Sequence, residues 1–206
     1  EGGLFAVTDA SGQKYTARCL VLATGPAREN LPPIPGLDLC ETYAGHSTDA
    51  AEYRNQRVLI IGKGNSAFET ADRLTGTAAV IHVLSPNPLR LAWETHYVGH
   101  LRAINNDFLD TYQLKSQNAV IDATVDWIEK DNGRYQVQIS YSHANGQRRL
   151  LSYDRVIACT GFRFDDSIFD DSCRPDTVFN GKYPAQTTSW ESTNVPGLFM
   201  AGNLMH

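Results

Sequence analysis

Residues 57–85 read RVLIIGKGNSAFETADRLTGTAAVIHVLS, and this stretch decides the fold. Its first five residues form an apolar run that predicts a buried strand, and the glycines after it predict a turn that opens a helix. Gly76 is placed to end this helix, and residues 79–85 predict a further strand. Strand, helix and strand follow within about thirty residues, the length of a βαβ unit, and predict an α/β fold with a parallel sheet.

The turn between the first strand and the helix has the spacing G-x-G-x-x-A, which is typical of dinucleotide-binding folds. The first glycine permits a tight turn, the second leaves room for a diphosphate, and the alanine allows close packing of the helix on the strand. The N–H groups and the dipole at the start of the helix favour negative charge. We therefore expect nucleotide binding at Gly62, Gly64, Asn65, Ser66 and Ala67; a glycine-rich strand–helix turn without a ligand is the alternative.

The end of the strand at 79–85 indicates which nucleotide is bound. NAD sites usually carry an acidic residue about 20 residues after the glycine turn, where it bonds the ribose 2′-OH. Here the corresponding stretch, SPNPLR, contains the hydroxyl of Ser85 and the cation of Arg90 but no acid. Both groups suit a 2′-phosphate, so we expect NADPH, with NADH as the alternative. His82, in the middle of the strand, is expected in the core, and no catalytic residue is assigned.

The sequence on either side predicts further elements. Apolar residues at helical spacing predict a helix over 93–117, broken near Asn105-Asn106. Alternating runs separated by Asn-Gly turns predict an antiparallel meander between 126 and 160. The run Cys19 to Ala23 predicts a strand buried on both faces. Three apolar strands are predicted to end alike, at Ala23-Thr24-Gly25, Cys159-Thr160-Gly161 and Ala201-Gly202-Asn203.

Composition excludes several classes of protein. Eighteen Lys and Arg against 23 Asp and Glu give the 206-residue chain a formal charge of −5, which argues against a nucleic-acid partner. No apolar run approaches the ~18 residues that span a bilayer. Four widely spaced cysteines have no metal-ligand spacing, so no metal is expected and the thiols are interpreted as free, buried or half-buried. The start at Glu1 without Met, and the end just after a motif, suggest a fragment of a longer protein.

Four segments together resemble a known family. GKGNSAFETADRL (62–74) is similar to the nicotinamide-site motif of flavoproteins with two dinucleotide-binding domains, a family that includes thioredoxin-reductase-like and flavin-monooxygenase-like enzymes. VLATG (21–25), TGFRFD (160–165) and VPGLFMAGN (195–203) are similar to the sequences that flank that site. Residues 95–116 and 153–169 resemble a narrower group, FAD-dependent oxidoreductases of the endoplasmic reticulum lumen that are linked to the disposal of misfolded glycoproteins.

The resemblance implies a Rossmann-like NAD(P)-binding domain, a parallel sheet plus a β-meander, inserted into an incomplete FAD-binding domain. It divides the chain into 1–44 (part of the FAD domain and a linker), 45–158 (the NAD(P)H domain) and 159–206 (return to the FAD domain). It implies FAD and NADPH as cofactors, with Ser85 and Arg90 near the 2′-phosphate. It also implies that FAD is approached by a set of residues at the strand ends: Thr24, Gly25, Gly161, Gly202 and Asn203.

This chain departs from the family pattern in three ways. The motif's usual Gly-Asp is Gly202-Asn203 here, which brings hydrogen-bonding capacity but no charge. The chain contains neither the amino-terminal FAD fingerprint nor a redox Cys-x-x-Cys.

Three functions remain open at this point. The first is an FAD-dependent oxidoreductase that takes hydride from NADPH, with thiol-redox or glycoprotein-disposal proteins as partners. The others are a flavin-dependent N- or S-monooxygenase and a non-catalytic quality-control adaptor built on the nucleotide fold.

Overall fold

The computed structural model describes residues 3–114 and 117–205, except for the side chains of residues 111–114. Contacts divide the chain into two compact units. The insert unit comprises residues 31–161, and the terminal unit comprises residues 1–30 and 162–206. Each unit is described by itself below.

The insert unit is built on a seven-stranded sheet of order β10-β9-β8-β7-β6-β11-β5. Its strands are β5 (Glu41–Thr42), β6 (Arg57–Ile61), β7 (Val80–Ser85), β8 (Ala119–Asp131), β9 (Arg134–Tyr141), β10 (Arg148–Tyr153) and β11 (Arg155–Ala158). The strands from β5 to the first residues of β8 are parallel, whereas the rest of β8 pairs antiparallel with β9, and β9 with β10. The predicted parallel sheet and meander are therefore one continuous sheet, because β8 belongs to both.

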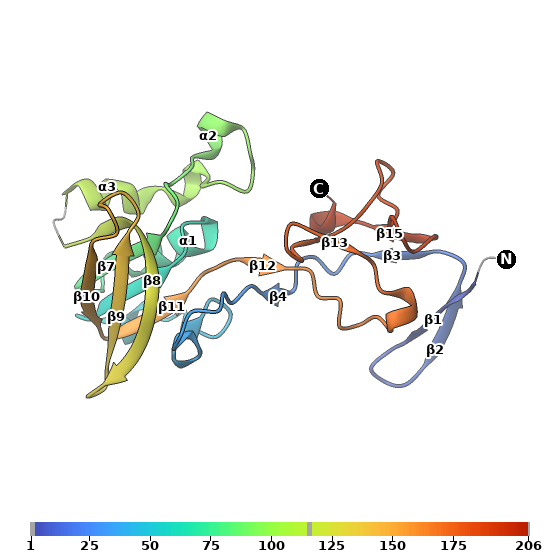
Figure 1. Cartoon of the computed structure of the whole chain (residues 1–206), viewed down its shortest axis with the longest axis horizontal. Helices are drawn as coiled ribbons and strands as arrows, with labels where there is room; N and C mark the ends of the chain where they lie inside the picture. Colours follow the sequence, from blue (N-terminus) through green and yellow to red (C-terminus); the bar gives the residue numbers. More distant parts are fainter. Residues whose placement is uncertain (1–2, 115–116, 206) are drawn as a thin grey trace. The chain divides into compact units, whose positions relative to one another are not determined.

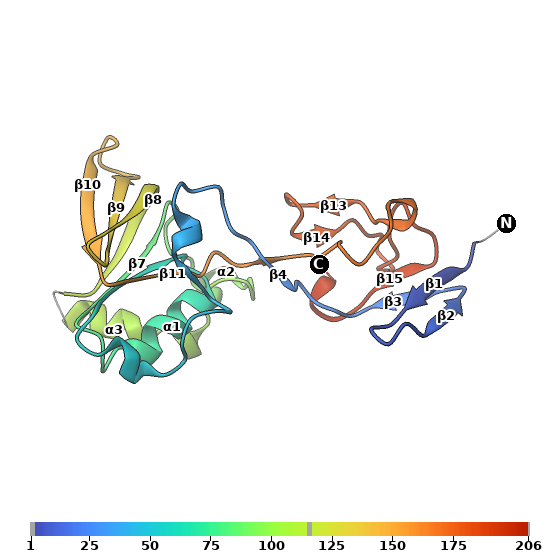
Figure 2. The same ribbon diagram turned by 90° about the horizontal axis from the view of Figure 1, so that it is seen from below.

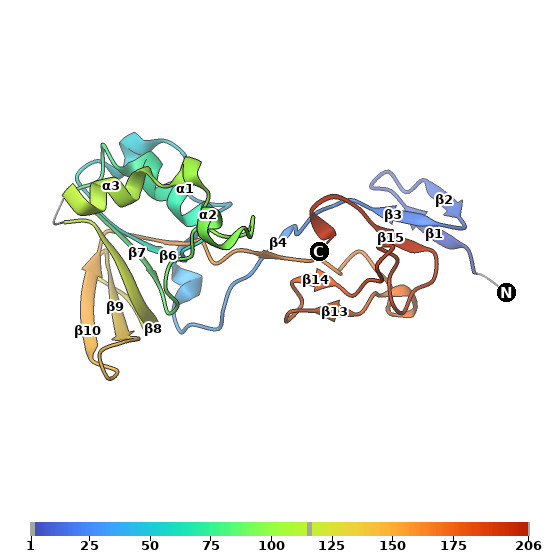
Figure 3. The same cartoon turned by 90° about the horizontal axis from the view of Figure 1, so that it is seen from above.

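Helices cover one face of the parallel strands. The helices of the insert unit are α1 (Asn65–Leu74), α2 (Ala92–Thr95) and α3 (Asp107–Leu114), and its short 3-10 turns are η1 (Leu37–Leu39), η2 (Ala50–Tyr53) and η3 (Ala103–Asn105). Figures 1, 2 and 3 place α1 and α3 side by side on one face, while the meander β8–β10 curls over the other. The parallel strands thus lie between two layers.

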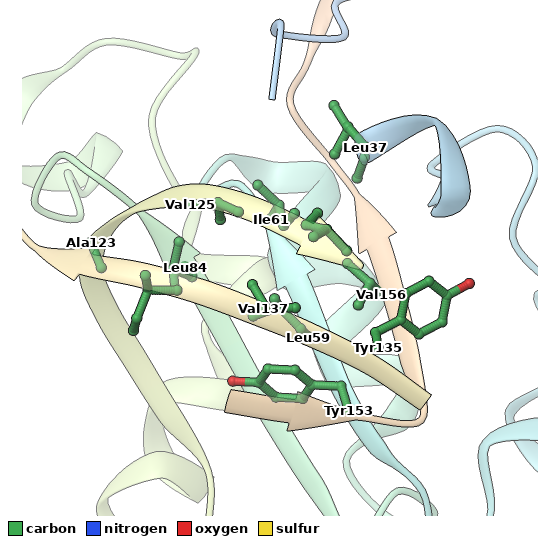
Figure 4. Packing of buried hydrophobic residues seen from close by; sticks show 13 residues of the cluster. Leu37, Leu59, Ile61, Leu84, Ala123, Val125, Tyr135, Val137, Tyr153 and Val156 are labelled. Carbon is green, nitrogen blue, oxygen red and sulfur yellow. The ribbon is translucent and has the colours of Figure 1, made fainter. Parts of the chain in front are cut away.

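This arrangement explains why residues 57–61 form a continuous apolar run. Val58 and Ile60 of β6 pack into the cluster under the helices, whereas Leu59 and Ile61 point into the cluster under the meander. Figure 4 shows the meander-side cluster, with Leu59 and Ile61 of β6 among Val137, Tyr153 and other side chains of the meander. Side chains alternate along a strand, so a strand covered on both faces needs apolar residues at every position.

The terminal unit consists of short strands in small sheets. A hairpin pairs β1 (Phe5–Thr8) with β2 (Lys14–Ala17), as the Asp-Ala-Ser-Gly turn indicates. β3 (Leu20–Leu22) pairs in parallel with β15 (Leu198–Met200). The remaining elements are β4 (Arg28–Glu29), β12 (Phe162–Arg163), β13 (Thr177–Val178), β14 (Tyr183–Pro184), η4 (Asp171–Cys173) and η5 (Gly202–Leu204).

Two expectations about local structure were wrong. The segment 93–117 is not one helix but α2, η3 and α3; the expected break near Asn105-Asn106 lies between η3 and α3, and residues 115–116 lie outside the described residues. His96 ends α2 in the left-handed region, and two apolar residues of the predicted helix, Val98 and Ile104, are 82% and 80% exposed. β3 is a strand, but Val21 in its middle is 63% exposed, so it is not buried on both faces in this unit.

The contact boundaries at 30/31 and 161/162 differ from the predicted divisions at 44/45 and 158/159. Residues 31–44 pack on the insert unit because Gly36 comes against the backbone of Ile128 in β8 and Leu37 enters the meander-side cluster. The assignment of the two units to FAD and NAD(P)H domains stays a prediction.

Candidate functional site

The glycine turn lies at the carboxyl end of β6, between this strand and α1. Gly62 has φ +131°, and a Cβ placed on it would lie 2.1 Å from the carbonyl oxygen of Cys159. Its N–H donates to the carbonyl of Leu84 at the end of β7 (2.7 Å). Only glycine is accommodated at this position, because β11 approaches the turn so closely.

Gly64 has the opposite environment. A Cβ placed on Gly64 meets no atom within 4 Å, so the space in front of it is open. Gly64 is the N-cap of α1 in an extended conformation, and neither a side-chain cap nor an acid in the first turn neutralises that end of the helix. The first N–H groups of α1, at Asn65, Ser66 and Ala67, are therefore available to an anion.

The side chains of Asn65 and Ala67 in that first turn make contacts within the insert unit. Ala67 is fully buried against the sheet, as its place in the motif predicts. The amide of Asn65 accepts hydrogen bonds from the Arg102 N–H (3.0 Å) and the Asn105 Nδ2 (3.1 Å), and donates to the carbonyl of His100 (2.9 Å). Asn65 thus ties the loop before α3 to the start of α1, and only its backbone faces the turn as the motif implies.

Ser85 and Arg90 lie on the segment that follows β7. Ser85 is the last residue of β7 and is paired in register with Asp122 of β8. The backbone carbonyl of Arg90 accepts from Leu101 N (3.0 Å). Among the described residues no carboxylate lies within 4 Å of the Arg90 side chain, so its cation is not committed to an ion pair there.

Sequence reasoning missed Lys63, the residue between the two glycines. Its side chain is only 5% exposed, and its ammonium donates to the carbonyl oxygens of Ser85 (3.1 Å) and Asn87 (3.0 Å) and to the carboxylate of Asp122. Lys63 therefore links the carboxyl ends of β6 and β7 to Asp122 in β8. A long cation inside a glycine turn was the available signal, but its acceptor Asp122 is distant in sequence.

His82 is half-buried in β7 and packs against a core tyrosine. Its Nδ1 lies 2.7 Å from the hydroxyl of the fully buried Tyr153, and the two rings meet edge to face. Burial lowers the pKa of His82 and raises the pKa of Tyr153. Both groups are therefore held neutral inside the sheet, away from the glycine turn.

In the terminal unit, two predicted segments meet at one sheet edge. β3 and β15 are paired in parallel, and Ala201 N donates to the carbonyl of Leu22 (2.9 Å). Thr24-Gly25 and Gly202-Asn203 therefore follow the carboxyl ends of neighbouring strands, with Gly25 and Gly202 at φ +67° and +66°. Ligands of α/β folds bind at such ends. Gly161, which follows β11, belongs to the insert unit.

The thiols and metal-ligand types do not form a reactive centre in the described part of the chain. Cys159 is buried and Cys40 and Cys173 are partly buried, whereas Cys19 is exposed. Burial, with the nearby acids Asp38 and Glu41, raises the pKa of Cys40 to about 12, so this thiol stays protonated. Among the described residues there is no metal-binding cluster and no helix able to cross a membrane.

Comparison with known proteins identifies the family to which this chain belongs. Residues 1–202 match the family of pyridine nucleotide-disulphide oxidoreductases. The chain belongs to this family. Membership confirms the resemblance drawn from the glycine turn and its flanking motifs, and the α/β fold.

Two relatives whose names describe an FAD-dependent oxidoreductase domain match nearly the whole chain. The chain is 39% identical to FAD-dependent oxidoreductase domain-containing protein 2 of Mus musculus, over 100% of this chain and 34% of the relative. It is 37% identical to the protein of the same name in Danio rerio, over 98% of this chain and 36% of the relative. The chain thus spans about a third of the length of these curated relatives.

One solved structure has the same fold as this chain. A bacillithiol disulfide reductase from Staphylococcus aureus superposes with a TM-score of 0.75 at 23% identity, over 98% of this chain and 58% of the other.

Proposed function

We propose that this chain is the nicotinamide-nucleotide-binding part of an FAD-dependent oxidoreductase that takes hydride from NADPH. Family membership implies FAD and a nicotinamide cofactor for the whole protein. The single observation that carries the proposal for this chain is the contrast between Gly62, which is packed tight, and Gly64, which faces open space beside an uncapped helix start.

The residues present suit a nicotinamide dinucleotide. Its diphosphate would lie on Gly64 and on the N–H groups of Asn65, Ser66 and Ala67, where the helix dipole favours negative charge. The side chains of Ser85 and Arg90 would lie near the 2′-phosphate of NADPH. NADPH would supply a hydride and FAD would accept it; the role of this chain is to orient the nucleotide and neutralise its phosphates.

In the terminal unit, the residues suit part of a flavin site. Thr24-Gly25 and Gly202-Asn203 are brought to one edge by β3 and β15, and a Cβ on Gly25 or Gly202 would meet no atom within 4 Å. This open edge would allow FAD to approach the backbone. Gly161 is proposed to contribute to the same flavin.

The proposal includes a cellular role. We place the full-length protein in the lumen of the endoplasmic reticulum, acting in protein quality control with glycoprotein-disposal or thiol-redox partners. The resemblance of residues 95–116 and 153–169 supports this role. Immunofluorescence of the full-length protein with a lumenal marker tests the location, and a cytosolic distribution would contradict it.

The test of the nucleotide site uses two glycines at opposite ends of α1 in the full-length protein. Gly64→Ala places a methyl group in the open space, and we expect the KM for NADPH to rise about tenfold or more. Gly76→Ala is the matched control, since a Cβ there also meets no atom within 4 Å and Gly76 lies at the far end of the helix. Equal KM values for the two variants, with wild-type melting temperatures, would contradict the site.

The reaction class has a separate test. Purified full-length protein should contain flavin absorbance and oxidise NADPH, passing electrons to a disulfide-containing acceptor. NADPH oxidation that instead consumes oxygen and rises with an amine or sulfide substrate would indicate a monooxygenase. Absence of flavin and of NADPH oxidation, with partner binding unaffected by Gly62→Ala plus Gly64→Ala, would indicate an adaptor.

A further inference from the structure

The ammonium group of Lys63 is enclosed at the carboxyl edge of the sheet. Its three protons have three acceptors, the carbonyls of Ser85 and Asn87 and the carboxylate of Asp122. With 5% of the side chain exposed, Lys63 is not free to reach a bound phosphate directly. Its effect on a nucleotide must therefore pass through the groups it holds.

Asp122 is the acidic residue at this edge that would affect binding of the ribose. It is the register partner of Ser85, and Ser85 stands at the strand end where NAD-binding folds place the acid that accepts the ribose 2′-OH. An acidic residue is therefore present, but it lies in β8, next to the strand that carries it in NAD-binding folds. The side chain of Asp122 is 33% exposed and borders a shallow surface depression of about 370 Å³, lined also by Ile121, Tyr141 and His143.

Both carboxylate oxygens of Asp122 face basic groups. Oδ1 accepts from Lys63, and Oδ2 lies 3.8 Å from Nε2 of His143, whose side chain is 68% exposed. With Lys63 in place, the lysine and aspartate charges cancel. Without Lys63, a carboxylate would stand beside the position of the ribose, repelling a 2′-phosphate and accepting a 2′-OH.

We propose that Lys63 sets the preference for NADPH over NADH by cancelling the charge of Asp122 beside the ribose. This inference rests on the nucleotide site proposed above and concerns only which nucleotide that site prefers. Lys63 is a positioning residue, because it acts on the nucleotide through Asp122.

The experiment measures the ratio of kcat/KM for NADPH to that for NADH, and the ratio of NADP⁺ to NAD⁺ affinity by calorimetry, on the full-length flavoprotein. Asp122→Asn keeps an acceptor for Lys63 while removing the negative charge, so we expect the NADPH:NADH ratio to rise about threefold or more. Lys63→Met leaves the carboxylate uncompensated, so we expect the ratio to fall about tenfold. Lys130→Met, at the far end of β8 where the ammonium lies over the Tyr135 ring, is the control and should leave the ratio unchanged.

The double variant Lys63→Met plus Asp122→Asn separates charge from loop positioning. Charge cancellation predicts a ratio within about threefold of wild type, because both charges are gone. A double variant that stays as low as Lys63→Met would show that Lys63 only holds the loop at 85–87, and would overturn the proposal.

Three further outcomes also test the role of Lys63 or the nucleotide site itself. If Lys63→Met does not fold, the near-isosteric Asp122→Asn decides alone, and an unchanged ratio overturns the proposal. If the wild-type protein binds neither NADP⁺ nor NAD⁺, the proposed nucleotide site itself fails. A wild type that binds both, with ratios that no variant moves, overturns only the role of Lys63.

Discussion

Strands β6 and β3 are both apolar runs that lead into a glycine, and they differ in what surrounds them. β6 pairs with β7 and β11 and is covered by helices and meander, so Val58 to Ile61 are buried. β3 is paired with β15, and its central Val21 is 63% exposed. An apolar run therefore predicts that a strand exists, while burial depends on neighbours that the run does not specify.

The glycines after the two strands differ in the same way. Gly62 is fixed by the backbone of Cys159, whereas a Cβ on Gly25 would meet no atom within 4 Å although its φ is also positive. In the insert unit the glycine is required by packing. In the terminal unit it is required only by backbone conformation.

The largest effect is expected from truncating the core of β6. Leu59→Ala removes a fully buried side chain from the cluster under the meander and should lower the free energy of unfolding by about 3–4 kcal/mol. Equilibrium urea unfolding of the chain measures the change. A loss below about 1 kcal/mol would mean that β6 is no better packed than β3, and would remove the difference between the two strands.

A smaller difference is expected between the two glycines. Gly62→Ala forces a Cβ against the carbonyl of Cys159 and should cost about 3 kcal/mol, from the clash and the positive φ together. Gly25→Ala is the matched substitution and should cost about 1 kcal/mol, from its backbone conformation alone. Equal losses in urea unfolding would contradict the packing argument.

Much of the insert unit could be predicted because its signals are local. The run 57–61, the spacing of Gly62 and Gly64 and the Asn-Gly turns each depend on neighbours in sequence. The helix predicted over 93–117 failed for the opposite reason. Its apolar spacing was real, but Val98 and Ile104 turn to solvent because Asn65 and the left-handed His96 fix the intervening loop.

The backbone turn of the site could be predicted from the sequence, whereas most of its side-chain hydrogen bonds could not. The glycine turn follows from spacing, but the bond from Lys63 to Asp122 and the three bonds of the Asn65 amide join residues far apart in the chain. Such pairs form only once the sheet aligns β6, β7 and β8. The spacing of a motif therefore does not indicate which of its side chains are hydrogen-bonded to other parts of the protein.

A third effect is a pH dependence of stability within the insert unit. Burial holds the pKa of His82 below its usual 6.5, so as pH falls below 6.5 the unfolded chain gains a proton that the folded chain does not, and stability falls. His82→Gln should abolish this loss, so the variant gains relative to wild type between pH 7 and 5, by at most about 1.4 kcal/mol per pH unit. Urea unfolding at a series of pH values measures the difference.

Asp72 provides the internal control for this pH dependence, because its sign is opposite. Burial raises the pKa of Asp72 to about 6 from 3.8, so falling pH between these values stabilises the folded state. Asp72→Asn should therefore lose stability relative to wild type as the pH falls below about 6, which overlaps the range in which His82→Gln gains it. Parallel curves for both variants would mean that neither group titrates as its burial indicates.

The smallest effect in this chain is expected at Val21. Because its side chain is mostly exposed, Val21→Ala should change the free energy of unfolding of the 206-residue chain by less than about 0.5 kcal/mol. The curated relatives are about three times as long, and we expect the rest of the full-length protein to cover β3 as helices and meander cover β6. The same substitution in the full-length protein should then cost about 2 kcal/mol and weaken FAD retention, measured by urea unfolding and by flavin released on dialysis. An equally small effect in both would mean that β3 stays exposed, and that the difference between β3 and β6 is a property of the whole protein.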